Sequence, residues 1–370
     1  MVKYVLLVAL TLIAATISRA QTIVKDSLDG SPIMQASVFD ERGCVLGVTD
    51  MEGRLPVLNN TQKIRINHIA YKTKDVDVRR MGNEIRLSPN AYQIREVVKE
   101  KEKPHCLKLT CYMRIYTLND GITQKNHEVD LPPILSFKDG IYHLYLFSDE
   151  SIHQSKARPL VVRNVLDGNE ADGGREMFYG LNLRSKVERF KGKNYELRGD
   201  NTKQDIYRVK KKETYQIGVL KRDTANKLIT VSEDFLAPKG TYKYNIGISK
   251  ATWTVWNYDY LYRLTPYDKV GQGDLLAYRE VVRMSGGLPF LKPGVQVGTW
   301  KYVEFFTYDA EYLTKEEYKA DKNEVKQSSM TMEDIDRIKN EIGVPALTDE
   351  IEQKLAASRL WLEEARKKKL

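Results

Sequence analysis

Short runs of alternating apolar and polar residues, separated by turn residues, fill the chain from residue 22 to residue 98. In one of these runs Ile64, Ile66 and His68 fall on one face and the polar residues between them fall on the other. A period of two is what a strand with one solvated face requires. Runs of this kind about every eight to twelve residues, punctuated by Asp-Gly, Asn and Gly, predict a small β-sandwich. We expect seven strands, at residues 22–24, 33–39, 44–49, 54–58, 63–69, 73–78 and 84–87.

A second and larger β-rich region follows a short linker. Residues 99–105 are charge-rich and contain Pro104, which is typical of a linker. Residues 106–312 then hold longer alternating runs, which predict an antiparallel β domain of about eight or more strands. These runs are residues 106–118, 141–147, 205–222, 227–235, 241–249, 251–264, 276–284 and 300–308. Residues 166–174 and 286–294 have the composition of loops.

The last part of the chain, residues 313–370, is expected to form two helices. Thr331-Met332-Glu333-Asp334 is a capping-box pattern, and Ile335, Ile338 and Ile342 follow it at helical spacing. Gly343 is a typical helix end.

The second of these helices is expected to begin after Thr348. Acidic residues occupy its first turn and the basic run 366–369 its end, which suits the helix dipole. Ile351, Leu355 and Leu362 form an apolar stripe. The helices either pack on the β domain or project from it, or this basic helix lies on a membrane surface.

Residues 1–20 have the pattern of an export signal. Lys3 is a small positive region, residues 4–17 are apolar but too few to span a bilayer, and Ser18-Arg19-Ala20 fits a signal-peptidase site. We expect cleavage between Ala20 and Gln21. No cysteine stands at that site, which disfavours a lipid anchor, and no later run of about 18 apolar residues predicts a helical membrane span. The mature protein is therefore expected in an exported compartment, which the resemblance described below would make the periplasm or the outer membrane.

The positive charge is concentrated at one end of the chain. The net charge is +9, and two of the positive charges belong to the signal segment, which leaves +7. The run Arg366-Lys367-Lys368-Lys369 supplies four of these. Because a basic tail alone says little about a partner and export separates the chain from nucleic acid, we expect no nucleic-acid partner.

Several short segments of the first region together resemble a known family. They are Gly30-Ser31-Pro32-Ile33, Ala36-Ser37-Val38, Gly47-Val48-Thr49-Asp50, Glu52-Gly53-Arg54-Leu55 and Ile66-Asn67-His68-Ile69-Ala70-Tyr71-Lys72. This order resembles the carboxypeptidase-regulatory-like domain, a transthyretin-like sandwich at the front of exported and outer-membrane proteins of the Bacteroidetes. The resemblance covers about a fifth of the chain and implies a non-catalytic accessory module. A TonB-dependent receptor is excluded because too few residues remain for a plug and a barrel of about 22 strands.

The second region resembles known proteins only loosely. Asp139-Gly140-Ile141-Tyr142 and the hairpin-rich residues 207–262 resemble the curved sheet of lipoprotein-carrier proteins. A plain β-sandwich or an unclassified sheet remains an alternative for this region.

Enzyme motifs are missing from the sequence. A zinc carboxypeptidase needs His-x-x-Glu, and none of the five histidines has a glutamate three residues on. The sequence also lacks a Gly-x-Ser-x-Gly elbow, a P-loop and a dinucleotide fingerprint. We therefore expect a non-enzymatic envelope protein without cofactor or metal, acting as an interaction or scaffold module. The alternatives are a lipid or glycan binder and a hydrolase of unrecognised class.

The cysteines are Cys44, Cys106 and Cys111, an odd number. If the last two share a strand, five residues at ~3.3 Å each place them ~17 Å apart on opposite faces. A disulfide needs Cα atoms within roughly 7 Å, so this pair forms only if a bend intervenes. The other interpretation is three buried or unpaired thiols.

The most aromatic stretch is residues 251–263. A period of two places Trp256, Tyr258, Tyr260 and Tyr262 on one side of a strand, and Trp253, Val255 and Leu261 on the other. The first row forms either the core between a sheet and its covering elements or a binding surface for a lipid or glycan.

Two tripeptides resemble the acceptor of Bacteroidetes periplasmic O-glycosylation. They are Asp26-Ser27-Leu28 and Asp223-Thr224-Ala225, both in expected turns. Ser27 and Thr224 are therefore candidate modification sites.

Overall fold

The computed structural model describes residues 21–90, 103–122, 131–147, 156–166, 181–211, 213–246, 249–265, 269–286, 296–325 and 329–369. The chain divides into two compact units, Met1–Pro89 and Asn90–Leu370. Ala20 and the rest of the expected signal, residues 99–102 of the expected linker, and residues 167–174 and 287–294 of the expected loops lie outside the described residues. Within the described ranges no helix is both long and apolar enough to cross a membrane.

The described residues of the first unit, 21–89, form six strands, where seven were expected from the sequence. β1 (Ile23–Asp26) pairs in parallel with β6 (Glu84–Leu87), and a four-stranded sheet has the order β3 (Val45–Val48), β2 (Ser37–Asp40), β4 (Lys63–His68) and β5 (Tyr71–Asp77). A single turn of 3-10 helix, Val78–Arg80, follows β5. Residues 54–58 form no strand and make one isolated bridge, between Arg54 and Ile23. Pro56 explains the difference, because proline has no N–H to donate to a ladder.

Local side-chain bonds fix the turn that ends β3. The Asp50 carboxylate accepts hydrogen bonds from the backbone N–H groups of Glu52 and Arg54, at 3.0 and 2.8 Å. Gly53 has φ +74°, and a Cβ there would lie 2.6 Å from the carbonyl oxygen of Val24. Both the backbone conformation and the close approach therefore require glycine at this position.

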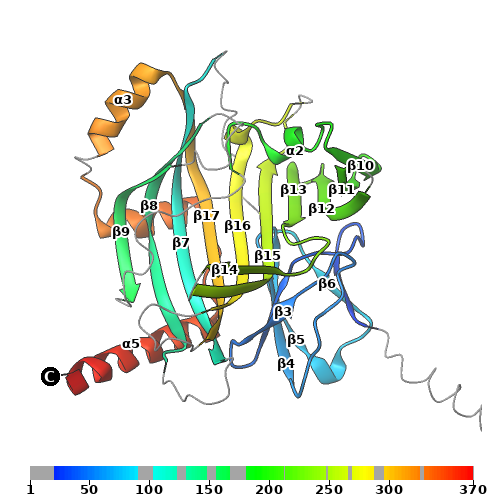
Figure 1. The fold of residues 1–370 in the computed structure, drawn as a ribbon, viewed down its shortest axis with the longest axis vertical. Helices are drawn as coiled ribbons and strands as arrows, with labels where there is room; N and C mark the ends of the chain where they lie inside the picture. Colours follow the sequence, from blue (N-terminus) through cyan, green and yellow to red (C-terminus); the bar gives the residue numbers. More distant parts are fainter. Residues whose placement is uncertain are drawn as a thin grey trace, which may run out of the picture. The chain divides into compact units, whose positions relative to one another are not determined.

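The large unit is built on one antiparallel sheet of eleven strands, so the expectation of a mainly β chain with a large antiparallel sheet is confirmed. The strands are β7 (Cys106–Ile122), β8 (Ile134–Leu146), β9 (Lys156–Leu166), β10 (Tyr195–Gly199), β11 (Lys203–Lys210), β12 (Glu213–Asp223), β13 (Leu228–Asp234), β14 (Tyr242–Ile246), β15 (Ser249–Arg263), β16 (Leu275–Gly286) and β17 (Val297–Leu313). The order across the sheet is β10-β11-β12-β13-β15-β16-β17-β7-β8-β9, and β14 also pairs with β15 (Figure 1). β17 extends to the residue at which we expected the helical region to start.

Four strands of this sheet differ from the expectation. The single run expected over residues 205–222 is a hairpin of β11 and β12, turned at Lys211 with φ +52°. β9 and β10 were not expected at all. β9 contains Pro159 and lies at the edge of the sheet, where a proline is tolerated.

The two faces of the sheet have different coverings. Side chains of the first face, which we name the apolar face, form the main core and include Leu107, Leu109, Cys111, Met113, Tyr258, Tyr260, Tyr262, Tyr278 and Phe305. The opposite face, the helix face, carries α4 (Met332–Ile342) and α5 (Asp349–Lys369), which contact β7, β8, β9 and β17. The buried apolar side chains of these two helices are Ile335, Ile338, Ile342, Ile351 and Leu355.

The described part of the C-terminal region has three helices, where two were expected. α4 begins at the expected capping residues, where the Asp334 carboxylate accepts from the N–H of Thr331 at 2.8 Å, and ends at Gly343 in the left-handed conformation. α5 begins after Thr348. The additional helix, α3 (Lys315–Glu324), has almost no apolar residues, so the sequence contains no apolar stripe that would predict it. Figure 1 shows α3 and α5 at opposite ends of β8.

Candidate functional site

Five aromatic side chains form a continuous surface where β14 pairs with β15. We name Phe235, Tyr242, Tyr244, Trp253 and Trp256 the aromatic surface. The ring centroids are 5.5 Å apart for Tyr242 and Trp253, 6.3 Å for Tyr244 and Trp253, 6.1 Å for Trp253 and Trp256, and 4.7 Å for Phe235 and Trp256. Phe235, Tyr242 and Tyr244 are 43, 51 and 40% exposed. A contiguous group of exposed aromatic rings is uncommon on a surface without a binding role.

A bulge in β15 brings the two tryptophans together. Trp253 pairs with Met284 and Val255 pairs with Arg283, so Thr254 is the extra residue on β15. The expectation that Trp253 faces away from Trp256 is therefore wrong, because a bulge shifts the alternation by one residue. The two indole rings lie nearly parallel, with an interplanar angle of 24°.

β14 supplies the tyrosines and lies at the edge of the sheet. Within the described residues it pairs only with β15, in a register that sets Tyr242 opposite Trp253 and Tyr244 opposite Ala251. Lys239 and Lys243 are exposed. The segment from residue 236 to residue 254 contains three lysines and no aspartate or glutamate. The edge hairpin is therefore both aromatic and basic.

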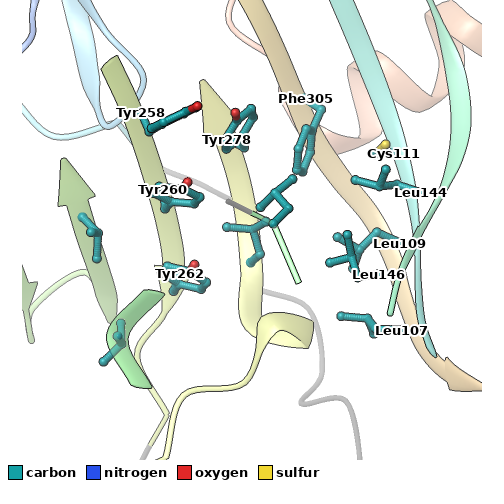
Figure 2. Close-up of a cluster of buried hydrophobic side chains, with 14 of the residues drawn as sticks. Leu107, Leu109, Cys111, Leu144, Leu146, Tyr258, Tyr260, Tyr262, Tyr278 and Phe305 are labelled. Carbon is teal, nitrogen blue, oxygen red and sulfur yellow. The ribbon is translucent and has the colours of Figure 1, made fainter. Parts of the chain in front are cut away.

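The expected aromatic row divides between this surface and the core. Trp256 is partly exposed, whereas Tyr258, Tyr260 and Tyr262 are at most 1% exposed and pack in the main core. Figure 2 shows these three tyrosines in a column along β15, with Tyr278 beside them. The rings of Trp256, Phe235 and Tyr258 remain in contact, so the surface is continuous with the core.

The hydroxyls of two neighbouring core tyrosines differ in their bonding. The Tyr262 hydroxyl accepts from the N–H of Lys186 at 3.1 Å and lies 3.5 Å from Gln272 Oε1. The Tyr260 hydroxyl is buried and has no hydrogen-bond partner among the described residues. Burial strongly raises the pKa of Tyr260, so this hydroxyl stays protonated.

Removing the Tyr260 hydroxyl is therefore expected to stabilise the protein. An unsatisfied buried polar group costs about 1–3 kcal/mol, so Tyr260→Phe should raise the free energy of unfolding by about 1–2 kcal/mol. Tyr262→Phe is the matched control and should lower it by about 1 kcal/mol. Urea denaturation of both variants makes the comparison. Equal losses in the two variants would show that the Tyr260 hydroxyl has a partner.

A buried ion pair lies against the same tyrosines. Lys186, in the short helix α2 (Lys186–Arg189), donates to the Glu233 carboxylate at 2.7 Å, and its ammonium lies 5.2 Å from the ring centroid of Tyr260 and 5.7 Å from that of Phe190. Burial lowers the pKa of Lys186. Burial also opposes the charge of Glu233, but the attraction and hydrogen bond of Lys186, together with the attraction of Arg208 and Arg189, outweigh it and lower the pKa of Glu233. The pair holds α2 on the apolar face.

Glu280 connects the aromatic surface to the interior. Its carboxylate accepts a hydrogen bond from the indole N–H of Trp256 at 2.7 Å, and it pairs across the sheet with Tyr258. Burial raises the pKa of Glu280 to about 7. Sequence reasoning missed this residue, although a glutamate within the apolar run of β16 is a usable signal.

A row of alternating charges crosses the helix face of the sheet. We name this set the charge row; its members pair in register from strand to strand and are Arg163, Asp139, Arg114, Glu304, Arg279 and Asp259. All except Arg163 are buried. The arginines donate to their partners at 2.7 Å (Arg163 to Asp139), 2.6 Å (Arg114 to Glu304) and 2.8 Å (Arg279 to Asp259).

The charge row also holds the helices in place. Arg114 donates to the carbonyl oxygen of Pro345 at 2.7 Å, and Arg163 contacts the Asp336 carboxylate of α4 at 3.2 Å. These bonds join the sheet to the α4 end of the helical region. The charge row therefore has a structural role, because its charged side chains pair with one another and do not line an open site.

The remaining residues singled out in the sequence are not members of the aromatic surface. Thr224 is exposed in the turn between β12 and β13, whereas Ser27 is partly buried in the first unit. Cys106 and Cys111 lie on β7 and are buried, Cys44 is exposed, and these three described thiols form no disulfide. Among the described residues no group of three or more His, Cys, Asp or Glu side chains could hold a metal ion.

The aromatic surface, the basic hairpin beside it and Glu280 behind it thus form the best candidate site in the described part of the large unit. The aromatic surface can contact a ligand through its exposed rings and the phenol hydroxyls of Tyr242 and Tyr244, while buried Glu280 bonds the Trp256 indole from behind. No protein-family model and no curated protein matches this chain.

Proposed function

We propose that this chain is an exported, non-enzymatic protein of the cell envelope that binds a lipid or glycan component through the aromatic surface. The observation that carries the proposal is the chain of ring contacts from Tyr242 through Trp253 and Trp256 to Phe235. Its two end members, Tyr242 and Phe235, are more than 40% exposed, and the two tryptophans between them are partly exposed. Of the three functions that the sequence leaves open, ligand binding is the one that this cluster of rings supports best.

Aromatic side chains suit an amphiphilic ligand. Tyrosine and tryptophan present a large apolar ring and one polar group, so they bind molecules that are apolar on one side and wet on the other. Two nearly parallel indole rings, Trp253 and Trp256, offer flat faces for a sugar ring or a lipid chain. An interaction or scaffold role for the same hairpin remains the alternative, because β14 has an edge to which another strand could add.

We also propose that the first unit is a carboxypeptidase-regulatory-like sandwich with an accessory role. Its two small sheets and the Asp50–Gly53 turn support this, since that turn carries part of the resemblance. Export, with cleavage before Gln21, and modification at the exposed Thr224 stay predictions from the sequence.

The binding proposal predicts a selective loss in one double variant. Trp253→Ala combined with Tyr244→Ala removes two partly exposed rings and should reduce binding of envelope lipid or glycan at least tenfold, because each anchoring aromatic contributes over 1 kcal/mol to a typical site. The measurement is titration of the purified protein with solubilised envelope lipids and, separately, with envelope polysaccharide.

The control for this test is Trp361→Ala on α5. Trp361 is a half-exposed tryptophan of the same unit outside the aromatic surface. Its removal should leave binding unchanged. If the double variant binds both preparations as the wild type does, while remaining folded, the proposed function is wrong.

A further inference from the structure

We propose that the aromatic surface docks on a membrane surface that carries anionic lipids, with Lys239 and Lys243 near the lipid headgroups. The inference rests on the proposed function and names the ligand class for the same surface. It is drawn from the combination of exposed aromatic rings and unopposed positive charge in one hairpin.

The charge distribution of the hairpin selects for a negative partner. Lys239 and Lys243 are exposed, and the 19 residues from 236 to 254 include no acidic side chain. Anionic lipids attract such lysines, and each lysine near the surface strengthens binding about fivefold. The hairpin therefore complements an anionic surface and not a neutral or cationic one.

The carboxyl groups next to the hairpin do little to cancel this charge. Asp234 precedes it and accepts a hydrogen bond from the N–H of Leu236 at 2.9 Å; burial raises the pKa of Asp234. Glu280 is buried and bonded to the Trp256 indole. Asp234 is partly buried and Glu280 is buried, whereas Lys239 and Lys243 are exposed, so the lysines are the charges that an approaching surface meets.

The arrangement of the side chains fits the interfacial layer of a bilayer. Tyr242 and Tyr244 share one face of the edge strand β14 and Lys243 projects from the other, so the long lysine side chain has to reach around this edge to the headgroups that the rings contact. Tyrosine and tryptophan rings favour the depth of the headgroups, and the flexible lysine stem lets an ammonium reach a phosphate while the rings lie deeper. The five rings are linked by four ring contacts, so together they present a larger apolar area than a single ring would.

Two other occupants fit the observations less well. A glycan would need several polar side chains around the rings to bond its hydroxyls, and the surface offers mainly rings and lysines. A peptide strand would pair with the main chain of β14 and would depend little on lipid charge or on the indole rings. Both remain outcomes of the experiment below.

The test is flotation of the folded full-length mature protein with vesicles. One set contains only phosphatidylcholine and a second contains phosphatidylcholine with phosphatidylglycerol. We expect the wild type to float with the anionic vesicles and to release them as salt is raised, because salt screens exposed charges. Trp253→Ala should lower the bound fraction at least fivefold, and Lys239→Glu with Lys243→Glu should abolish the preference for anionic vesicles.

Matched controls test the location of the contact. Lys227→Glu changes an exposed lysine in the turn between β12 and β13, and Arg366→Glu with Lys367→Glu changes the basic end of α5. Both should bind vesicles as the wild type does. Loss of binding in the α5 variant with full binding in the hairpin variants would overturn the inference and assign the contact to α5.

The outcomes separate this inference from the proposed function. If the wild type binds both vesicle types equally and Trp253→Ala reduces this binding, the aromatic surface remains the binding site but the inferred preference for anionic lipids is wrong. If the protein binds no vesicles but binds envelope polysaccharide, and Trp253→Ala removes that binding, the membrane inference is wrong and the proposed function holds. Wild-type behaviour of Trp253→Ala toward every preparation would overturn both.

Discussion

Replacing Arg279 with methionine is expected to lower the free energy of unfolding of the large unit by about 3–5 kcal/mol. Arg279 is fully buried and donates to the Asp259 carboxylate through Nε at 3.1 Å and Nη2 at 2.8 Å. The Ser232 hydroxyl, at 2.6 Å, would remain as a donor to Asp259, but this carboxylate would lose the two charged N–H donors of Arg279. Removing one member of a buried pair costs more than the pair contributes, since the other charge stays desolvated. Urea denaturation of wild type and variant measures the change.

Two further variants test this explanation. Arg279→Met combined with Asp259→Leu removes both charges and should recover most of the lost stability. Arg198→Met breaks an exposed pair with Glu196 at the edge of the sheet and should change stability by less than about 1 kcal/mol. A double variant less stable than Arg279→Met would show that the charge row acts through a larger network than this pair.

The strands of the large unit could be predicted, but their order could not. Alternation along a single strand such as β15 is visible in the sequence, because one face is apolar along most of its length. Arg114 and Glu304 are 190 residues apart, and nothing local marks them as partners. The charge row can be recognised only when the register of six strands is known, so it could not be predicted from the sequence. The edge strand β9 was missed for a related reason, since Pro159 suggests a break where an edge strand can accept it.

The candidate site was predicted only in part, because the alternation within one strand is visible in the sequence and the register between strands is not. Alternation correctly placed Trp256 and Tyr258 on one face of β15, where both contact Phe235. It placed Trp253 on the wrong face because a bulge at Thr254 cannot be read from a period of two. The tyrosines of β14 were not singled out, since their meeting with Trp253 depends on the register of the hairpin.

Glu280 is expected to make the stability of the large unit fall as the pH rises from about 4.5 to about 7. Burial raises the pKa of Glu280 from 4.5 to about 7 in the folded protein, so between these values the folded state binds a proton that the unfolded state has lost. Stability decreases with pH wherever the folded state holds more protons, and it levels off above the folded pKa. At 1.36 kcal/mol per pKa unit the total change attributable to this group is about 3 kcal/mol. Glu280→Gln cannot ionise and should lose this dependence.

The measurement is the free energy of unfolding at a series of pH values for both proteins, read as the difference between them. That difference should change by about 3 kcal/mol between pH 4.5 and pH 8. Glu213→Gln, at an exposed glutamate of β12, should run parallel to the wild type. Trp256→Phe removes the N–H that stabilises the carboxylate, and it should therefore move the midpoint of the change to higher pH. A constant difference between wild type and Glu280→Gln would show that the carboxyl is hydrated in solution, and that the indole of Trp256 does not bond to a buried group.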